Sequence, residues 1–178
     1  MGKLIVRTGE EITSQDHALF FDAEFGCSGV MDRGKKLLLT VASANSIKIA
    51  DGIVVIQGRP YVIYPNELVT LTVENGTQNM KRNDLVVAEF SKDSSSETFS
   101  FKVIKGTAVA SNPVDPSISQ QDTLTSGTKY QLPLYRIRLN GINIEGTDDL
   151  RTYIPSLHKT MQVISETDDY VEVEFNLR

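Results

Sequence analysis

The stretch Asp84–Phe90 (DLVVAEF) decides the fold, because it has the strongest buried-strand character in the sequence. Apolar residues run without interruption through its centre, as in a strand that is covered on both faces. We therefore predict that it lies in the middle of a sheet. Neighbouring segments alternate between apolar and polar residues, with the period of two that a half-buried strand requires. These segments are 69–73, 99–103 and 132–139.

Short β-rich runs also precede this strand, separated by Gly, Asn, Asp and Pro as in antiparallel sandwiches and barrels. The runs are 37–41, 46–50, 53–57 and 60–64. Asp51-Gly52 lies between two of them and suits a tight primed turn, because both residue types tolerate positive φ. The sequence thus predicts that 46–50 and 53–57 pair as a hairpin within a meander.

One helix is predicted near residues 14–25. Thr13 with Asp16 three positions later resembles a capping box, and Gly26 suits the left-handed residue that ends a helix. The segment is too apolar for a free surface helix, so we expect it to cover one side of a sheet. The predicted fold class is mainly β, an antiparallel β-sandwich or barrel-like domain with one short N-terminal helix.

The main β-rich domain is expected to span residues 1–154, followed by a C-terminal extension, 155–178, with one strand. In that strand, 171–175, apolar residues alternate with glutamates, which leaves open whether it packs on its own core or on a neighbouring subunit. Two polar segments are candidate contact surfaces. They are the loop 91–97, which we expect to be a mobile hairpin loop, and 110–128, which exceeds the usual loop length and either wraps over the surface or meets a partner.

The composition excludes several classes of partner. A formal net charge of -5 argues against nucleic acid, because binding a phosphate backbone needs concentrated Lys and Arg. We expect no membrane partner either, since no run approaches the roughly 20 apolar residues that span a bilayer. The only cysteine, Cys27, cannot form an internal disulfide, and we interpret it as a small, partly buried structural residue.

No residue pattern in the sequence indicates a catalytic, cofactor-binding or metal site. His17 and His158 are far apart and have no cysteine nearby that would complete a zinc pattern. The turn Gly26–Gly29 (GCSG) is one residue short of a nucleophile elbow. The prediction is a non-enzymatic protein with no catalytic residue, cofactor or metal. A cell-wall hydrolase is an alternative, because paired carboxylates can hydrolyse glycosides. The carboxylates available for it are Asp22, Glu24, Asp32, Asp148 and Asp149.

Two places put an arginine close to an aspartate at the boundary of a strand-rich block. Arg82 stands two positions before Asp84, and Asp149 stands two positions before Arg151. A guanidinium binds carboxylates and backbone carbonyls through its planar fork of donors, which favours a structural pair over a ligand site. We therefore predict that Arg82, Asp84, Asp149 and Arg151 are structural anchors.

Several motifs follow one another in a recognisable order. They are ITSQD before the helix, DGIVVIQGRPYVI, KRNDLVVAEF, VIKGTA, a Ser/Pro/Gln-rich segment, YQLPLYRIRLNG and DDLR. Over roughly residues 10–154 this order resembles the N-terminal domain of bacteriophage baseplate and tail-fibre attachment proteins, including upper baseplate proteins, of phages and prophages of Gram-positive bacteria.

This resemblance implies a virion structural protein that folds in the host cytoplasm and then joins the tail. Its expected partners are other tail or baseplate proteins and copies of itself, as a homo-oligomer such as a trimer or ring. Because the sequence ends at Arg178, it lacks the length of a fibre stalk or a separate receptor-binding head. We therefore expect an assembly or adaptor role in the tail or baseplate.

An alternative function is a carbohydrate-binding module that recognises the host cell wall, with a host glycan as its ligand. Four tyrosines within the β-rich segments motivate this alternative, although tyrosine is also an ordinary strand residue. They are Tyr61, Tyr64, Tyr130 and Tyr135.

Overall fold

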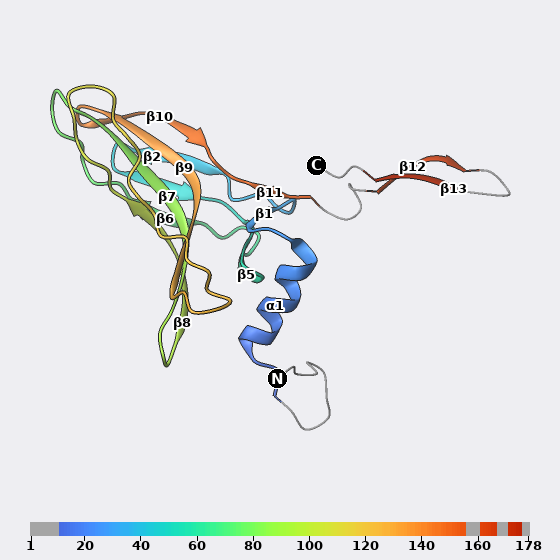
Figure 1. Ribbon diagram of the computed structural model, residues 1–178. Helices are drawn as coiled ribbons and strands as arrows, with labels where there is room; N and C mark the ends of the chain where they lie inside the picture. Colours follow the sequence, from blue (N-terminus) through green and yellow to red (C-terminus); the bar gives the residue numbers. More distant parts are fainter. Residues whose placement is uncertain (1–10, 156–160, 167–170, 176–178) are drawn as a thin grey trace.

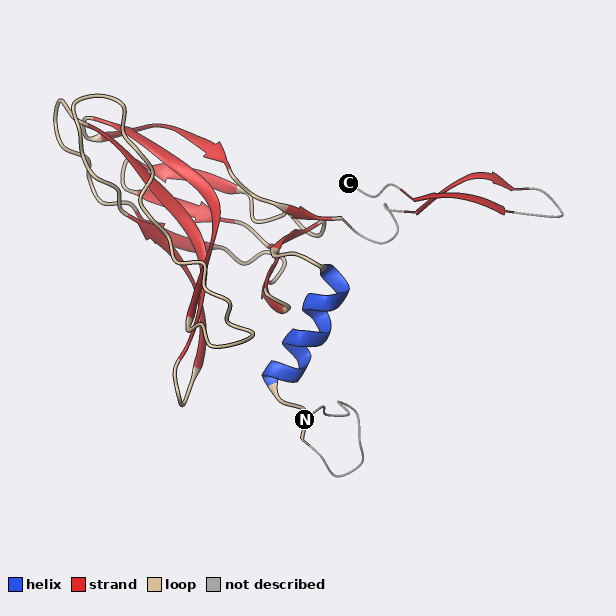
Figure 2. Ribbon diagram, viewed as in Figure 1, coloured by secondary structure: helices blue, strands red, loops and turns tan. Residues whose placement is uncertain are grey.

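A computed structural model of the chain describes residues 11–155, together with the backbone of 161–166 and 171–175. Figures 1 and 2 show strands stacked in layers, with a helix at one side. The elements are α1 (Ser14–Phe25), β1 (Gly29–Met31), β2 (Leu39–Ser43), β3 (Ser46–Ile49), β4 (Gly52–Ile56), β5 (Arg59–Ile63), β6 (Val69–Thr72), β7 (Lys81–Lys92), β8 (Glu97–Ile104), β9 (Lys129–Asn140), β10 (Asn143–Asp149), β11 (Tyr153–Ile154), β12 (Met161–Glu166) and β13 (Val171–Phe175). The predicted fold class, mainly β with a short N-terminal helix, is confirmed.

Three sheets build the sandwich. One layer is the long sheet, with strand order β10-β9-β7-β8. The other layer consists of the three-stranded sheet, β2-β3-β6, and the terminal sheet, β11-β1-β4-β5. The strand pairs are antiparallel except for β1 and β11, which run parallel. Strand β11 thereby ties the end of the β-rich domain to the strand that follows α1.

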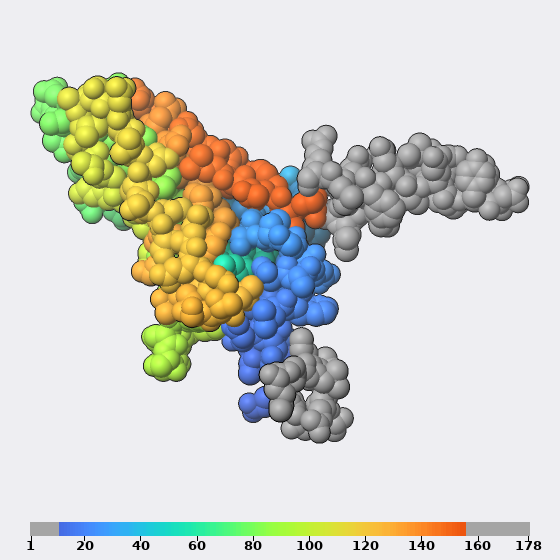
Figure 3. Space-filling model, in the orientation of Figure 1, coloured from blue at the N-terminus to red at the C-terminus, as the bar shows by residue number. Residues whose placement is uncertain are grey.

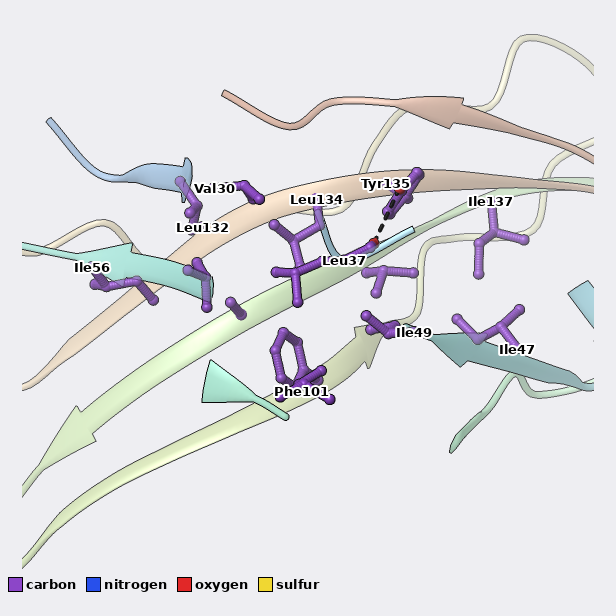
Figure 4. Close-up of a cluster of buried hydrophobic side chains, with 14 of the residues drawn as sticks. Val30, Leu37, Ile47, Ile49, Ile56, Phe101, Leu132, Leu134, Tyr135 and Ile137 are labelled. Atoms are coloured by element: carbon purple, nitrogen blue, oxygen red, sulfur yellow. Dashed lines mark hydrogen bonds between the residues drawn. The ribbon is translucent and has the colours of Figure 1, made fainter. Parts of the chain in front are cut away.

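The sandwich is organised around β7, as predicted for a doubly covered central strand. Residues 82–90 are all buried, and β8 and β9 pair along the two edges of β7. Val86, Ala88 and Phe90 join the apolar core between the layers. The connector, residues 105–128 between β8 and β9, covers the opposite face, where Val87 is fully buried. Figure 4 shows side chains of both layers meeting in this core.

The Tyr135 hydroxyl links the two layers. It donates a hydrogen bond to the carbonyl oxygen of Leu37 and accepts one from the N–H of Leu39, both at 3.2 Å (Figure 4 shows the first). Lys36 and Leu37 have positive φ angles of 55° and 57°. Strand β2 therefore begins at Leu39 and not at Leu37 as predicted, because this turn places the Leu37 side chain in the core.

The predicted hairpin at Asp51-Gly52 is wrong. Strand β3 pairs with β2 and β6, whereas β4 pairs with β1 and β5, so the chain passes from one sheet to another at this point. Gly52 is required by close packing, because a Cβ there would lie 2.7 Å from the backbone nitrogen of Leu37. A hairpin turn with two positive φ angles lies instead between β4 and β5, at Gln57 (45°) and Gly58 (71°).

Helix α1 has the predicted caps but a smaller buried face than expected. The Thr13 hydroxyl accepts the N–H of Asp16, the Asp16 carboxylate accepts the N–H of Thr13, and Gly26 is left-handed with a φ of 67°. Only Ala18 of the helix is buried, so the expectation that α1 covers one side of a sheet is wrong. The helix approaches the β4–β5 turn at one point, where Gly58 lies against the backbone of Ala18.

The C-terminal extension contains two strands where one was predicted. Strand β12 supplies the partner of β13, since a lone strand would leave its backbone N–H and C=O groups unpaired. The hairpin is a sheet of its own, and Figure 1 shows it apart from the sandwich. Residues 156–160, 167–170 and 176–178 lie outside the described residues, so packing on the core or on a neighbouring subunit stays a prediction.

Replacing Gly58 with Ala should release α1 from the sandwich. Gly58 and Gly141 both have positive φ, 71° and 60°, so Ala at either position costs roughly 1–2 kcal/mol of backbone strain. Only at Gly58 does the added Cβ also collide with the Ala18 carbonyl. We expect amide hydrogen exchange of residues 14–25 to accelerate in Gly58→Ala and not in Gly141→Ala. Equal protection of the helix in the two variants would contradict this account.

Candidate assembly surface

Arg82 and Asp84 form a buried ion pair at the start of β7. The Nε and Nη2 atoms of Arg82 donate to the two carboxylate oxygens of Asp84, at 2.8 and 2.9 Å. The guanidinium also donates to the carbonyl oxygens of Glu74 and Asn75, at 2.6 and 3.2 Å. Asp84 accepts the N–H of Gly106 at 2.9 Å. The pair thus fastens the β6–β7 loop and the start of the connector to β7.

Asp149 and Arg151 form a second bidentate pair. Arg151 donates to the carboxylate of Asp149 at 2.8 and 2.6 Å, and to the carbonyl oxygen of Lys36 at 2.5 Å. Its guanidinium also lies over the rings of Tyr135 and Tyr153, 4.8 and 5.2 Å from their centres. The hydrogen bonds from Arg151 lower the pKa of Asp149. This pair links the end of β10 to the turn before β2.

The connector is held on the long sheet by charged contacts that the sequence analysis missed. Asp115 accepts from Nε and Nη2 of Arg136, at 2.7 and 2.5 Å, and from the amide of Asn83 at 2.9 Å. These Arg136 hydrogen bonds lower the pKa of Asp115 and raise that of Arg136. Figure 3 shows the connector, yellow to light orange, lying across this face. The predicted alternation did put Arg136 on the face away from the core, but Asp115 lies in a segment without periodicity.

Arg59 fastens the far end of the connector to α1. Its side chain is almost fully buried, and its guanidinium lies 4.4 Å from the centre of the Phe90 ring. It donates to the hydroxyl of Thr123 at 3.2 Å and to the side-chain oxygen of Gln15, in α1, at 2.9 Å. Burial lowers the pKa of this guanidinium. Gln57 accepts from the N–H and hydroxyl of Thr123, at 2.9 and 2.5 Å. The direction of α1 is therefore set by polar contacts.

Helix α1 exposes large apolar side chains. Leu19 is 47% exposed and Phe20 is 58% exposed. The charged residues of the helix are all acidic, namely Asp16, Asp22 and Glu24. A capped helix that is anchored to the sandwich yet keeps apolar side chains in solvent is a candidate protein-contact surface. The apolar content of this segment predicts burial, but the sequence alone does not distinguish burial within the chain from burial by a partner.

The tip of the β7–β8 hairpin is stabilised by a side chain. The carboxylate of Asp93 accepts the N–H groups of Ser95 and Ser96, at 2.7 and 2.8 Å. Together with bonds from both serine hydroxyls, these hydrogen bonds lower the pKa of Asp93 to about 2. The loop 91–97 therefore has a hydrogen-bonded turn at 93–96, and the strands extend to Lys92 and from Glu97.

The four tyrosines do not form one surface. Tyr135 is buried, and Tyr61 stacks on Phe99 with ring centres 4.4 Å apart. Tyr130 packs against the core, whereas Tyr64 is 64% exposed. They do not build a shared stacking platform for a sugar, and the carbohydrate-binding alternative draws no support from their arrangement.

Few features point to chemistry. No group of His, Cys, Asp and Glu residues within the described part of the chain could hold a metal ion. Cys27 is exposed, so the prediction of partial burial is wrong; it follows the helix-ending Gly26, outside the core. Two carboxylates considered for hydrolysis are engaged in ion pairs, since Asp148 contacts Arg136 at 3.2 Å and Asp149 contacts Arg151 at 2.6 Å.

Comparison with known proteins assigns the chain to no family. The chain matches no protein-family model, and no curated protein matches it. Among the described residues, no helix has both the length and the apolar character needed to cross a membrane.

Replacing Asp84 with Ala should destabilise the protein strongly. The substitution leaves the buried Arg82 guanidinium without its carboxylate, a loss that costs about 3–5 kcal/mol in comparable sites. Glu74→Ala, which removes an exposed partner of Lys105, should leave the free energy of unfolding nearly unchanged. Urea denaturation measures both. Arg82→Met with Asp84→Leu should recover part of the loss, and a cost of Asp84→Ala no larger than that of Glu74→Ala would refute the anchor role.

Stability should fall in acid. The pKa values of Asp115 and Asp149 are lowered in the folded state, so their contribution is complete above the ordinary value of 3.8 and is lost as the pH falls through the lowered values. We expect the free energy of unfolding to decrease below about pH 4. Asp115→Asn and Arg136→Gln should each make this decrease shallower, and the double variant should add nothing further. An unchanged slope in both single variants would contradict the assignment.

Proposed function

We propose that this protein is a non-enzymatic structural component of a phage or prophage tail or baseplate, acting as an assembly or adaptor protein in the virion tail. The observation that carries the proposal is the position of α1. Its caps fix its two ends, and Arg59 and Gly58 hold it on the sandwich, while Leu19 and Phe20 remain in solvent. The ordered motifs that resemble phage baseplate proteins support the same role.

Such a protein acts by holding its binding partners in a fixed arrangement. Arginine-centred contacts tie the connector to the long sheet and α1 to the connector, so the sandwich and the helix form a defined scaffold. A partner would cover the apolar side chains of α1 and meet its acidic residues at the rim, the usual anatomy of a protein interface. The hairpin tip at 91–97 and the connector offer further polar contacts to other tail proteins.

Binding to tail proteins encoded in neighbouring genes tests this proposal. The wild-type protein should form a homo-oligomer in light-scattering measurements, such as a trimer or ring, and should bind at least one of those proteins. Leu19→Ser with Phe20→Ser should weaken that binding by about tenfold or more, because the apolar centre of an interface contributes most of its affinity. A strict monomer that binds none of the tail proteins would count decisively against the proposal.

The matched control is Ile142→Ser. Ile142 is 58% exposed, like Phe20, but it lies in the β9–β10 turn. The control should bind tail proteins as the wild type does. Circular dichroism and thermal unfolding should be the same for all three proteins, since the substituted side chains are exposed. Equal loss of binding in the control would mean that α1 is not the specific contact.

A further inference from the structure

The terminal sheet has a partly exposed apolar area on the face directed away from the core, where Val62 is 38% exposed and Ile53 is half-buried. Val54 and Ile56 of β4 join the core, so the alternate residue Ile53 faces the other way, beside its cross-strand partner Val62. Ile53, Met31 and Ile154 line a shallow hollow of about 420 Å³. An adjoining hollow of about 200 Å³ is lined by residues that include Ile53 and Val62. Together these hollows form one groove, called the terminal-sheet groove below.

The turn 32–36, which borders this groove, carries a small excess of positive charge over its ion-paired carboxylates. Arg33 lines both hollows, Asp32 lines one and Asp51 the other, and Lys35 and Lys36 lie beside them in the same turn as Arg33. Asp32 pairs with Lys36 at 2.5 Å, and Asp51 lies 3.6 Å from Lys35. Three cations against two carboxylates leave an excess of one positive charge on a chain whose formal net charge is -5. An acidic segment with apolar residues is the complementary occupant.

The β12–β13 hairpin has that composition. Residues 161–175 contain five acidic residues and no Lys or Arg. The strand register places Met161 opposite Phe175 and Val163 opposite Val173, and opposite positions share a face of the sheet. A two-stranded hairpin alone is at best marginally stable in water. The hairpin therefore needs a surface that accepts apolar residues, and Figure 1 shows it apart from the sandwich of its own chain.

We propose that the β12–β13 hairpin of one copy of this protein docks on the terminal-sheet groove of a second copy. Ile154 of β11 lines the groove, and the hairpin follows β11 closely in the chain, so each copy presents a donor and an acceptor side by side. Each copy can then donate to one neighbour and accept from another, which closes a ring, or two copies can exchange hairpins. This inference rests on the self-association proposed above and assigns it a surface.

Charge-reversal substitutions on the two surfaces test the proposal in the full-length chain. Arg33→Glu with Lys35→Glu makes the groove rim acidic, and Glu172→Lys with Glu174→Lys makes strand β13 basic, because these two glutamates are its only charged residues. Each double variant alone sets like charges against each other, and we expect its self-association to weaken by about tenfold or more in sedimentation velocity at low salt. Mixing the two variants should restore association into dimers or even-numbered rings, because the basic β13 fits the acidic groove and the acidic β13 fits the basic groove.

A charge-reversal variant elsewhere on the sandwich serves as the matched control. Lys48→Glu with Lys81→Glu reverses two exposed charges elsewhere on the sandwich and should associate like the wild type. If both groove and hairpin variants assemble like the wild type, or if mixing them fails to restore assembly, the docking proposal is overturned while self-association stands. If the wild-type chain is monomeric, the docking proposal and the proposed oligomer fail together, and binding to other tail proteins then decides the remaining function.

Discussion

The burial of β7 on both faces is the constraint on which the rest of the structure depends. On one face, Val86 and Phe90 pack between the layers with residues of the opposing sheets. On the other face the described part of the chain places no second sheet, so the connector has to exclude water from Val87 and to satisfy polar groups such as Asn83. A strand buried in this way requires a long connection that is bound tightly, because a loose one would expose it.

Arginine side chains bind the connector to the sheet and also join other segments that are distant in sequence. Arg82, Arg136 and Arg151 each make a bidentate contact with a carboxylate, and Arg59 joins α1 to the connector through neutral oxygens. The planar guanidinium can bind a carboxylate and a backbone carbonyl at once, which suits the joining of segments distant in sequence. The resulting scaffold keeps α1 in place although the helix buries little apolar surface. That combination is what makes α1 available to a partner.

Local patterns predicted most elements, but they did not predict which strands pair. The alternation of 132–139 correctly assigned opposite faces to Ile137 and Arg136. The hairpin predicted at Asp51-Gly52 is wrong, because the same residue types occur in hairpin turns and where the chain crosses between sheets. Of the contacts in the candidate surface, the Arg82 and Arg151 contacts were visible as short-range pairs. The Asp115–Arg136 contact was not, since its two residues are distant in sequence and Asp115 follows no periodic pattern.

The sequence by itself determined the strand-rich class, the caps of α1 and the central place of β7, because periodicity and capping are local properties of the chain. The tertiary structure decided the exchange of strands between sheets, the course of the connector over β7 and the exposure of Leu19 and Phe20. These features depend on which surfaces meet. An apolar residue looks the same in a sequence whether it is buried in the core or exposed on the surface. Only the folded structure shows which of the two holds.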